Sequence, residues 1–333
     1  MEIVDTIYND SWGRLDPWVL SRMDGKSLLT EIEANADLIL DNLDFASLRD
    51  RASHSITDNF NIIERDRLIP YSAGRSIPAR IYQPERLTLT NKCLVFIHGG
   101  GFYSGNLNSF NKECRYLSQK GQMTVVALEY RLAPESPFPA AYKDVTESLS
   151  WLINDQSKLG LQEAEFYLAG DSAGGNLCVV AGLSELAHHI KQIFAIYPAL
   201  DITEPDKTVY HWSYDNYQMS DEEKPFILSR LNKFVWINRV IALLYPNGEE
   251  LSNPLISPVY AKDLSSFPKL TLFEAEFDYY LQSNRYFAKR LSEVNKEVEE
   301  IVYKGMDHGF FDRSGSQGQA EDIMNRIVQT ILK

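Results

Sequence analysis

Short apolar runs recur along the chain from residue 61 onward, and their spacing predicts strands. These runs are residues 61–68, 79–82, 93–97 and 123–130, and further runs begin at residues 166, 193, 270 and 299. From the third run onward they are separated by stretches with the apolar period of a helix, at 111–120, 140–156, 172–188, 282–295 and 319–332. Such alternation is typical of an α/β fold. We therefore expect eight strands in a mostly parallel sheet with helices on both faces.

Two segments do not follow this alternation. Residues 1–60 carry apolar positions at helical spacing, for example at 28–40, and show no strand-like alternation, so we expect helices there. Residues 203–250 form an insertion rich in aromatic side chains. Aromatic residues outside the sheet need a surface to pack against. We predict that both segments form a helical cap above the carboxyl ends of the strands of a core domain, residues 61–333.

A serine with glycines on both sides lies between a predicted strand and a predicted helix, in Gly170-Asp171-Ser172-Ala173-Gly174. A sharp strand-to-helix turn can hold a serine hydroxyl out as a nucleophile. Glycine is expected two residues before and after Ser172 because strand and helix pack too closely there for side chains. The pattern often arises by chance, so Ser172 needs partners elsewhere in the chain.

A run of glycines, His98-Gly99-Gly100-Gly101, follows another predicted strand. Glycines free the backbone to aim N–H groups at the negative charge that develops on a carbonyl oxygen during acyl transfer. We predict an oxyanion hole made by the N–H groups of Gly100, Gly101 and Ala173. The alternatives are a flexible turn or a phosphate cradle, but the chain has no G-x-x-x-x-G-K-[ST] and no complete G-x-G-x-x-G pattern. For the ring of His98 we predict a hydrogen bond within the glycine loop.

The expected general base is His308. A serine hydroxyl is a weak nucleophile, so a histidine must accept its proton and a carboxylate must orient that histidine. His308 lies in a loop after the strand-like segment that begins near residue 299. His188 and His189 are expected at the C-terminal end of the helix over 172–188, where they would be structural.

The expected acid is Asp278, which emerges just past the carboxyl end of the strand that begins at residue 270. Glu274 and Glu276 are its rivals, but the two-residue alternation of a strand makes their projection from the tip less certain. Asp307, next to the histidine, is interpreted as a loop residue.

With these residues in place, the sequence resembles the hormone-sensitive-lipase-like branch of the α/β-hydrolases over about residues 60–333. The resemblance rests on the order Ser172, Asp278, His308, on both glycine motifs, on Glu129-Tyr130-Arg131-Leu132-Ala133-Pro134-Glu135 and on Phe138-Pro139-Ala140-Ala141. It implies an α/β-hydrolase fold and hydrolysis of esters through a serine acyl-enzyme, without metal or organic cofactor. The chain departs from many relatives after Asp278. Tyr279-Tyr280-Leu281-Gln282 stands where they carry a leucine and a second aspartate, which leaves the conformation of this loop open.

The aromatic residues of the insertion are mostly interpreted as the core of the cap itself. The candidates for contact with the substrate are Phe102, Tyr210, Trp212, Tyr214 and Tyr217.

Composition and charge limit the partners and the location that we expect for this protein. The formal net charge of −13 predicts a surface that repels nucleic acid and anionic membranes. No stretch is long and apolar enough to span a membrane, and no signal-peptide pattern is present, so we expect neither a membrane span nor secretion. The cysteines Cys93, Cys114 and Cys178 fall in predicted core elements, which suggests free thiols and a cytoplasmic location. Relatives often dimerise, so a homodimer is possible.

The leading hypothesis is a serine carboxylesterase that acts on a small-molecule ester, with short acyl groups of about two to six carbons preferred by resemblance. An amidase, formamidase or peptidase with the same triad is the first alternative, because the same three residues can hydrolyse esters and amides. A ligand-binding receptor that has lost catalysis, as the plant gibberellin receptors have, is the second. The presence of Ser172, Asp278 and His308 together argues against that second alternative.

Overall fold

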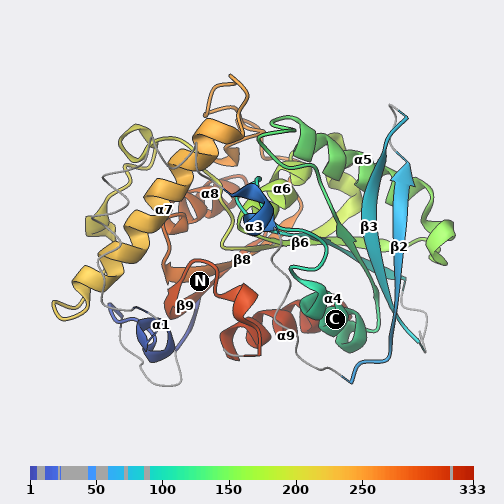
Figure 1. Ribbon diagram of the computed structural model, residues 1–333, viewed down its shortest axis with the longest axis horizontal. Helices are drawn as coiled ribbons and strands as arrows, with labels where there is room; N and C mark the ends of the chain where they lie inside the picture. Colours follow the sequence, from blue (N-terminus) through green and yellow to red (C-terminus); the bar gives the residue numbers. More distant parts are fainter. Residues whose placement is uncertain are drawn as a thin grey trace.

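The computed structural model describes residues 1–5, 12–21, 23, 44–49, 59–70, 74–85, 91–315 and 318–333. Within these ranges, nine strands form one sheet that runs through the molecule (Figure 1). Its pairs are parallel except for β2 with β3 and β3 with β5. In spatial order the strands are β1 (Glu2–Val4), β9 (Val298–Asp307), β8 (Lys269–Phe277), β7 (Ile190–Ile196), β6 (Glu165–Asp171), β4 (Lys92–Ile97), β5 (Thr124–Leu128), β3 (Ser76–Pro84) and β2 (Ile62–Pro70).

The central strands are mostly apolar because helices cover both of their faces. Val95 of β4, Leu168 of β6 and Ile193 of β7 are fully buried. One face packs against α5 (Ala140–Asn154), α6 (Ser172–Gly182) and α8 (Leu281–Glu293), and the other against α4 (Asn111–Gly121) and α9 (Gly318–Leu332) (Figure 1). The predicted mostly parallel sheet with helices on both faces is therefore confirmed.

The predicted number of strands was one too low. Glu2–Val4 forms β1 at the edge of the sheet, parallel to β9 with Ile3 opposite Val302, where the sequence had indicated only helices. A three-residue strand is too short to show alternation, and its pairing depends on the backbone groups of β9. Elsewhere in the first 60 residues α1 (Pro17–Ser21) and α3 (Phe45–Arg49) are helical. The helix expected at 28–40 lies outside the described residues.

The helix that begins at Ser172 is shorter than predicted. It ends at Gly182, and Ser184 accepts a hydrogen bond from the Leu186 N–H at 3.2 Å to start a separate short turn, η2 (Glu185–His189). A serine side chain that bonds the backbone in this way competes with continuation of a helix. His188 and His189 lie in that turn and not at the end of the long helix.

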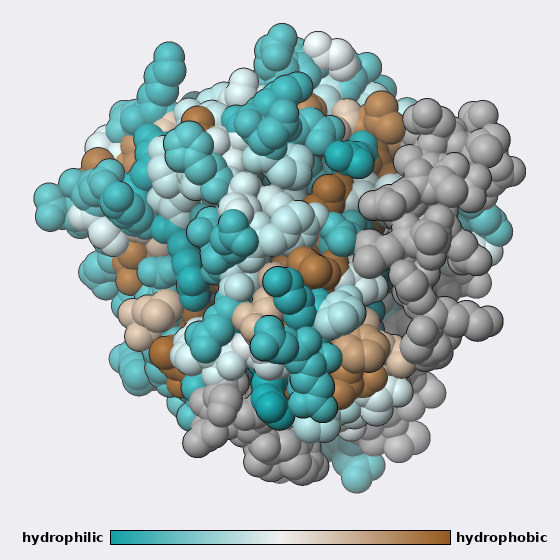
Figure 2. All heavy atoms as spheres, turned by 90° about the vertical axis from the view of Figure 1, so that its left-hand side faces the viewer, coloured by the Kyte–Doolittle hydropathy of each residue, from teal (hydrophilic) through white to brown (hydrophobic). Residues whose placement is uncertain are grey.

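The insertion at residues 203–250, for which a cap is predicted, contains one long helix, α7 (Lys224–Leu244). In Figure 1 it lies at the left of the molecule near α8. The face of the molecule on that side is mostly hydrophilic, with apolar patches between polar groups (Figure 2). Short 3-10 turns complete the described elements: η1 (Gln156–Leu159), η3 (Pro205–Lys207), η4 (Tyr214–Asn216), η5 (Pro258–Tyr260) and η6 (Phe311–Arg313). In the described ranges, none of the helices has the length and apolarity that crossing a membrane requires.

Candidate active site

Ser172 occupies a sharp turn between β6 and α6. Its φ is 50°, in the left-handed region that side chains rarely adopt. A Cβ on Gly170 would lie 2.6 Å from the carbonyl oxygen of Ile97, and one on Gly174 would lie 2.6 Å from that of His98. Both neighbours are backbone atoms that cannot move aside. The predicted steric need for glycine on both sides of Ser172 is therefore confirmed.

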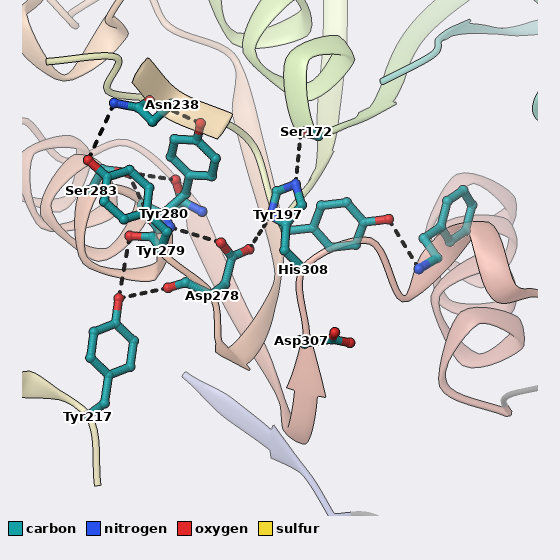
Figure 3. A network of polar contacts seen from close by, with 12 residues as sticks. Ser172, Tyr197, Tyr217, Asn238, Asp278, Tyr279, Tyr280, Ser283, Asp307 and His308 are labelled. Atoms are coloured by element: carbon teal, nitrogen blue, oxygen red, sulfur yellow. Dashed lines mark hydrogen bonds and ion pairs between the residues drawn. The ribbon is translucent and has the colours of Figure 1, made fainter. Parts of the chain in front are cut away.

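The structure brings Ser172, Asp278 and His308 together at the carboxyl ends of β6, β8 and β9 (Figure 3). His308 Nδ1 lies 2.7 Å from Asp278 Oδ2, and its Nε2 lies 2.8 Å from Ser172 Oγ. A carboxylate only accepts hydrogen bonds, so the proton of the neutral ring belongs on Nδ1, and Nε2 is left to accept from the serine hydroxyl. Asp278 is 1% and His308 6% exposed. The arrangement can therefore deprotonate a serine away from bulk water.

The carboxylate that contacts His308 Nδ1 is Asp278, and the rival carboxylates lie elsewhere. Glu276 accepts the N–H groups of Gly13 at 2.7 Å and Gly305 at 2.8 Å, and burial raises its pKa to about 7. Glu274 is buried with no hydrogen-bond partner for either oxygen in the described part of the chain. Asp307 binds Arg313 and points away from the imidazole contact (Figure 3).

The loop that begins at Asp278 contains the residues at which the sequence departs from many relatives. The backbone N–H of Tyr280 donates to Asp278 Oδ1 at 2.9 Å, which leaves Oδ2 for the histidine. The Tyr217 hydroxyl donates to the Asp278 carbonyl at 2.7 Å. The indole N–H of Trp212 donates to the carbonyl of Tyr279 at 3.0 Å. Two of these hydrogen bonds thus come from aromatic residues of the insertion, Tyr217 and Trp212.

The glycine loop lies beside the serine turn. Gly100 has a φ of 121° and Gly101 a φ of 61°, and the carbonyl of Gly100 accepts the N–H of Ser104 at 2.9 Å. Asp171, the residue before Ser172, accepts the N–H of Gly99 at 2.6 Å and joins the two motifs. Asp171 is buried, and desolvation raises its pKa well above the ordinary value.

His98 holds the glycine loop in shape, as predicted. Its Nδ1 lies 2.8 Å from the carbonyl oxygen of Gly99, and its ring stacks on Tyr130 with centroids 4.4 Å apart. Burial lowers the pKa of the imidazole to about 4, so the ring is neutral near pH 7. A neutral ring with Nδ1 facing a carbonyl donates its proton there.

The backbone amides predicted for the oxyanion hole are available for a ligand. Within the described ranges, the N–H groups of Gly100 and Gly101 donate no hydrogen bond. Ala173 lies in the first turn of α6, where an N–H has no acceptor inside the helix. Their role as an oxyanion hole stays a prediction.

Comparison with known proteins places this geometry in a family. A family model described as the alpha/beta hydrolase fold matches residues 94–312. The chain belongs to the α/β-hydrolase family. Its matches are consistent with the hormone-sensitive-lipase-like branch that the motifs indicated.

Individual relatives of this α/β-hydrolase are esterases by name. It is 28% identical to an arylesterase of Saccharolobus solfataricus over 77% of this chain and 80% of the relative. It is 26% identical to an ethyl acetate hydrolase of Pseudomonas putida over 78% and 79% of the two chains. The solved structure of an esterase from Pyrobaculum calidifontis superposes with a TM-score of 0.69 at 27% identity, over 96% of this chain and 98% of that one.

The hydrolase uses several of the predicted substrate contacts for internal packing. Phe102 is fully buried and stacks on Tyr245 at 3.9 Å. Tyr214 donates to the side chain of Asn232. Tyr210 packs against Tyr286 with ring centroids 5.7 Å apart. Trp212 and Tyr217 both donate to backbone carbonyls of the Asp278 loop, and Tyr217 does so from the side away from Ser172 (Figure 3). A direct contact between these five residues and the substrate stays a prediction.

Three aromatic rings that the sequence did not assign to the site surround His308. Ring centroids lie 4.2 Å away for Phe234, 4.7 Å for Tyr197 and 5.5 Å for Tyr280. Tyr197 could have been noticed because it follows the end of a predicted strand. Phe234 is one of many aromatic residues of the insertion, and nothing in its spacing indicates that its ring faces the histidine.

Proposed function

We propose that this protein is a serine carboxylesterase. The observation that carries the proposal is the continuous line of hydrogen bonds from Asp278 through His308 to Ser172, with distances of 2.7 Å and 2.8 Å. Such a line is what a serine needs for attack on a carbonyl group. The names of the esterase relatives support ester hydrolysis over other chemistries of the fold.

The reaction proceeds in two halves. Ser172 Oγ attacks the carbonyl carbon of the ester while His308 Nε2 takes its proton, and Asp278 stabilises the imidazolium. The tetrahedral intermediate collapses, the bond to the alcohol breaks, and His308 returns the proton to the departing oxygen. Water then attacks the acyl-serine, giving its proton to the same nitrogen. The second collapse releases the acid and restores the hydroxyl of Ser172.

The charge on the tetrahedral oxygen requires donors that already point at it. The amides of Gly100, Gly101 and Ala173 are proposed for this role, each contributing about 3 kcal/mol by analogy with other oxyanion holes. The positive φ values at Gly100 and Gly101 fix the directions of two of these groups. The hydrogen bond that the Gly99 N–H donates to Asp171 ties the glycine loop to the residue before Ser172.

The test is the replacement Ser172→Ala. Wild-type protein should release a burst of p-nitrophenol from a p-nitrophenyl ester and bind one phosphonate per chain, and the variant should do neither. Ser266→Ala, at an exposed position, is the matched control and should behave as wild type. Undiminished turnover by Ser172→Ala would refute the proposal. Matched ester and amide substrates decide between an esterase and an amidase.

The cytoplasmic location and the homodimer also stay predictions. Cys93, Cys114 and Cys178 are buried and unpaired, which suits a reducing compartment.

A further inference from the structure

One stripe of α7 contacts the loops that carry the proposed acid and base. Arg230, Phe234 and Asn238 follow each other at intervals of four residues on this helix. Residues at this spacing lie on one face of a helix. Each of the three contacts a different part of the site.

At the first position, Arg230 Nε lies 3.5 Å from Asp307 Oδ2. Asp307 is the residue before His308 and is buried, and Arg313 Nη1 contacts its other oxygen at 2.6 Å. This side chain therefore joins α7 to the end of β9, where the histidine begins its loop. In the described part of the chain the hydrogen bonds to Asp307 come from Arg313, and the contact of Arg230 is an ion pair without a hydrogen bond.

At the second position, the ring of Phe234 packs on the imidazole of His308 with centroids 4.2 Å apart and planes inclined by 45°. This contact limits rotation of the imidazole about its side-chain bonds. The ring of Tyr280 lies at 5.5 Å from the same imidazole.

At the third position, the side chain of Asn238 is only 1% exposed, and both its amide nitrogen and its amide oxygen make hydrogen bonds. Its amide nitrogen donates to the carbonyls of Ile202 and Thr203, both at 3.1 Å. Its oxygen accepts the Tyr280 hydroxyl at 3.1 Å (Figure 3). Tyr280 is the residue whose own N–H holds the Asp278 carboxylate at 2.9 Å. Asn238 is thus linked to Asp278 through Tyr280.

We infer that α7 positions the acid and the histidine through this stripe, Arg230, Phe234 and Asn238. The inference rests on the proposed function. It gives α7 a role in the geometry of the proton relay itself, beyond covering a pocket. Because Asn238 and Tyr280 are both about 1% exposed, their side chains have little surface for a substrate, and their effect must act through the two groups that Tyr280 contacts, Asp278 and His308.

The central experiment is a double-mutant cycle with Asn238→Leu and Tyr280→Phe. Each single variant should lower kcat for a p-nitrophenyl ester by about tenfold to a hundredfold with KM within about twofold, since small displacements of reacting groups have effects of this size. The double variant should be no slower than the slower single one, because both changes break the same bond. Leu243→Ala, 65% exposed on the far side of α7, is the matched control and should keep the wild-type kcat.

A spectroscopic readout reports on geometry without turnover. The proton shared by His308 Nδ1 and Asp278 should give a far-downfield resonance in the wild type. It should weaken or move in Tyr280→Phe and stay unchanged in Leu243→Ala. If Asn238→Leu does not fold, as circular dichroism would show, Tyr280→Phe and Phe234→Leu carry the test with the same two readouts.

The outcomes separate the two proposals. Wild-type kcat and an unmoved resonance in folded Tyr280→Phe and Phe234→Leu, with Ser172→Ala inactive, would overturn the role of α7 and leave the esterase intact. A raised KM with unchanged kcat would also overturn the role of α7, because that pattern is expected of residues that only line the substrate pocket. Retained activity in Ser172→Ala would instead overturn the proposed function.

Discussion

Glu113 on α4 should make the protein less stable as the pH rises from 5 to 8. Its side chain is 2% exposed, and one oxygen accepts the hydroxyl of Ser314, in the segment that follows η6. The other oxygen has no partner in the described part of the chain. Burial raises the pKa of the carboxyl from 4.5 to about 7. The folded protein therefore binds a proton in a range of pH where the unfolded chain has released it.

The size of the effect follows from these two pKa values. Below pH 4.5 both states hold the proton and no stability is lost, and above pH 7 the loss is complete. Between pH 5 and pH 8 the free energy of unfolding should fall by about 2.5 kcal/mol on account of this group. In Glu113→Gln the side chain is uncharged throughout, so this decline should be absent.

The assay is urea denaturation followed by tryptophan fluorescence at pH 5 and pH 8. The difference in unfolding free energy between Glu113→Gln and wild type should grow by about 2.5 kcal/mol in favour of the variant. Any cost of the new amide is the same at both pH values and cancels in this comparison. Glu250→Gln, at an exposed position, controls for the loss of one carboxylate. An equal difference at pH 5 and pH 8 would refute the reasoning.

Two further predictions concern the serine turn and the substrate. Gly174→Ala places a methyl group against the backbone carbonyls of Ile97 and His98, so it should cost about 3 kcal/mol of stability. A thermal midpoint equal to that of wild type would contradict this. A series of p-nitrophenyl esters from acetate to decanoate should give the highest kcat/KM for acyl groups of about two to six carbons. A maximum at decanoate would contradict the expected preference.

The fold could be predicted because its central strands are buried on both faces. Residues 93–97 of β4 and 166–170 of β6 are apolar, and this pattern together with helices between the strands leaves few alternatives to a parallel sheet. β1 could not be predicted, because three residues carry no period and their partner lies some 300 residues away in sequence. The end of α6 depended on the side chain of Ser184, a local competition that apolar spacing does not report.

The three candidate catalytic side chains could be found because their types and their positions after strands are restricted by chemistry. The residues that contact and position these side chains could not be predicted. Asn238 and Arg230 are polar residues on a helix, and only the fold shows that Asn238 faces Tyr280 and Arg230 faces Asp307. The tyrosines after Asp278 had appeared only as a departure from a motif. In the structure, the Tyr280 hydroxyl donates to Asn238 of the insertion.

The attachment of the Asp278 loop to the insertion has a consequence for protein engineering. In many enzymes a lid can be exchanged between homologues to alter selectivity while the chemistry beneath it is kept. Here Tyr217 donates to the carbonyl of Asp278, and Asn238 accepts from Tyr280. A chimera that imports a foreign segment over 203–250 would remove both contacts. Such a graft needs the donor's residues at 279 and 280 as well, so the two pieces have to be transplanted as one unit.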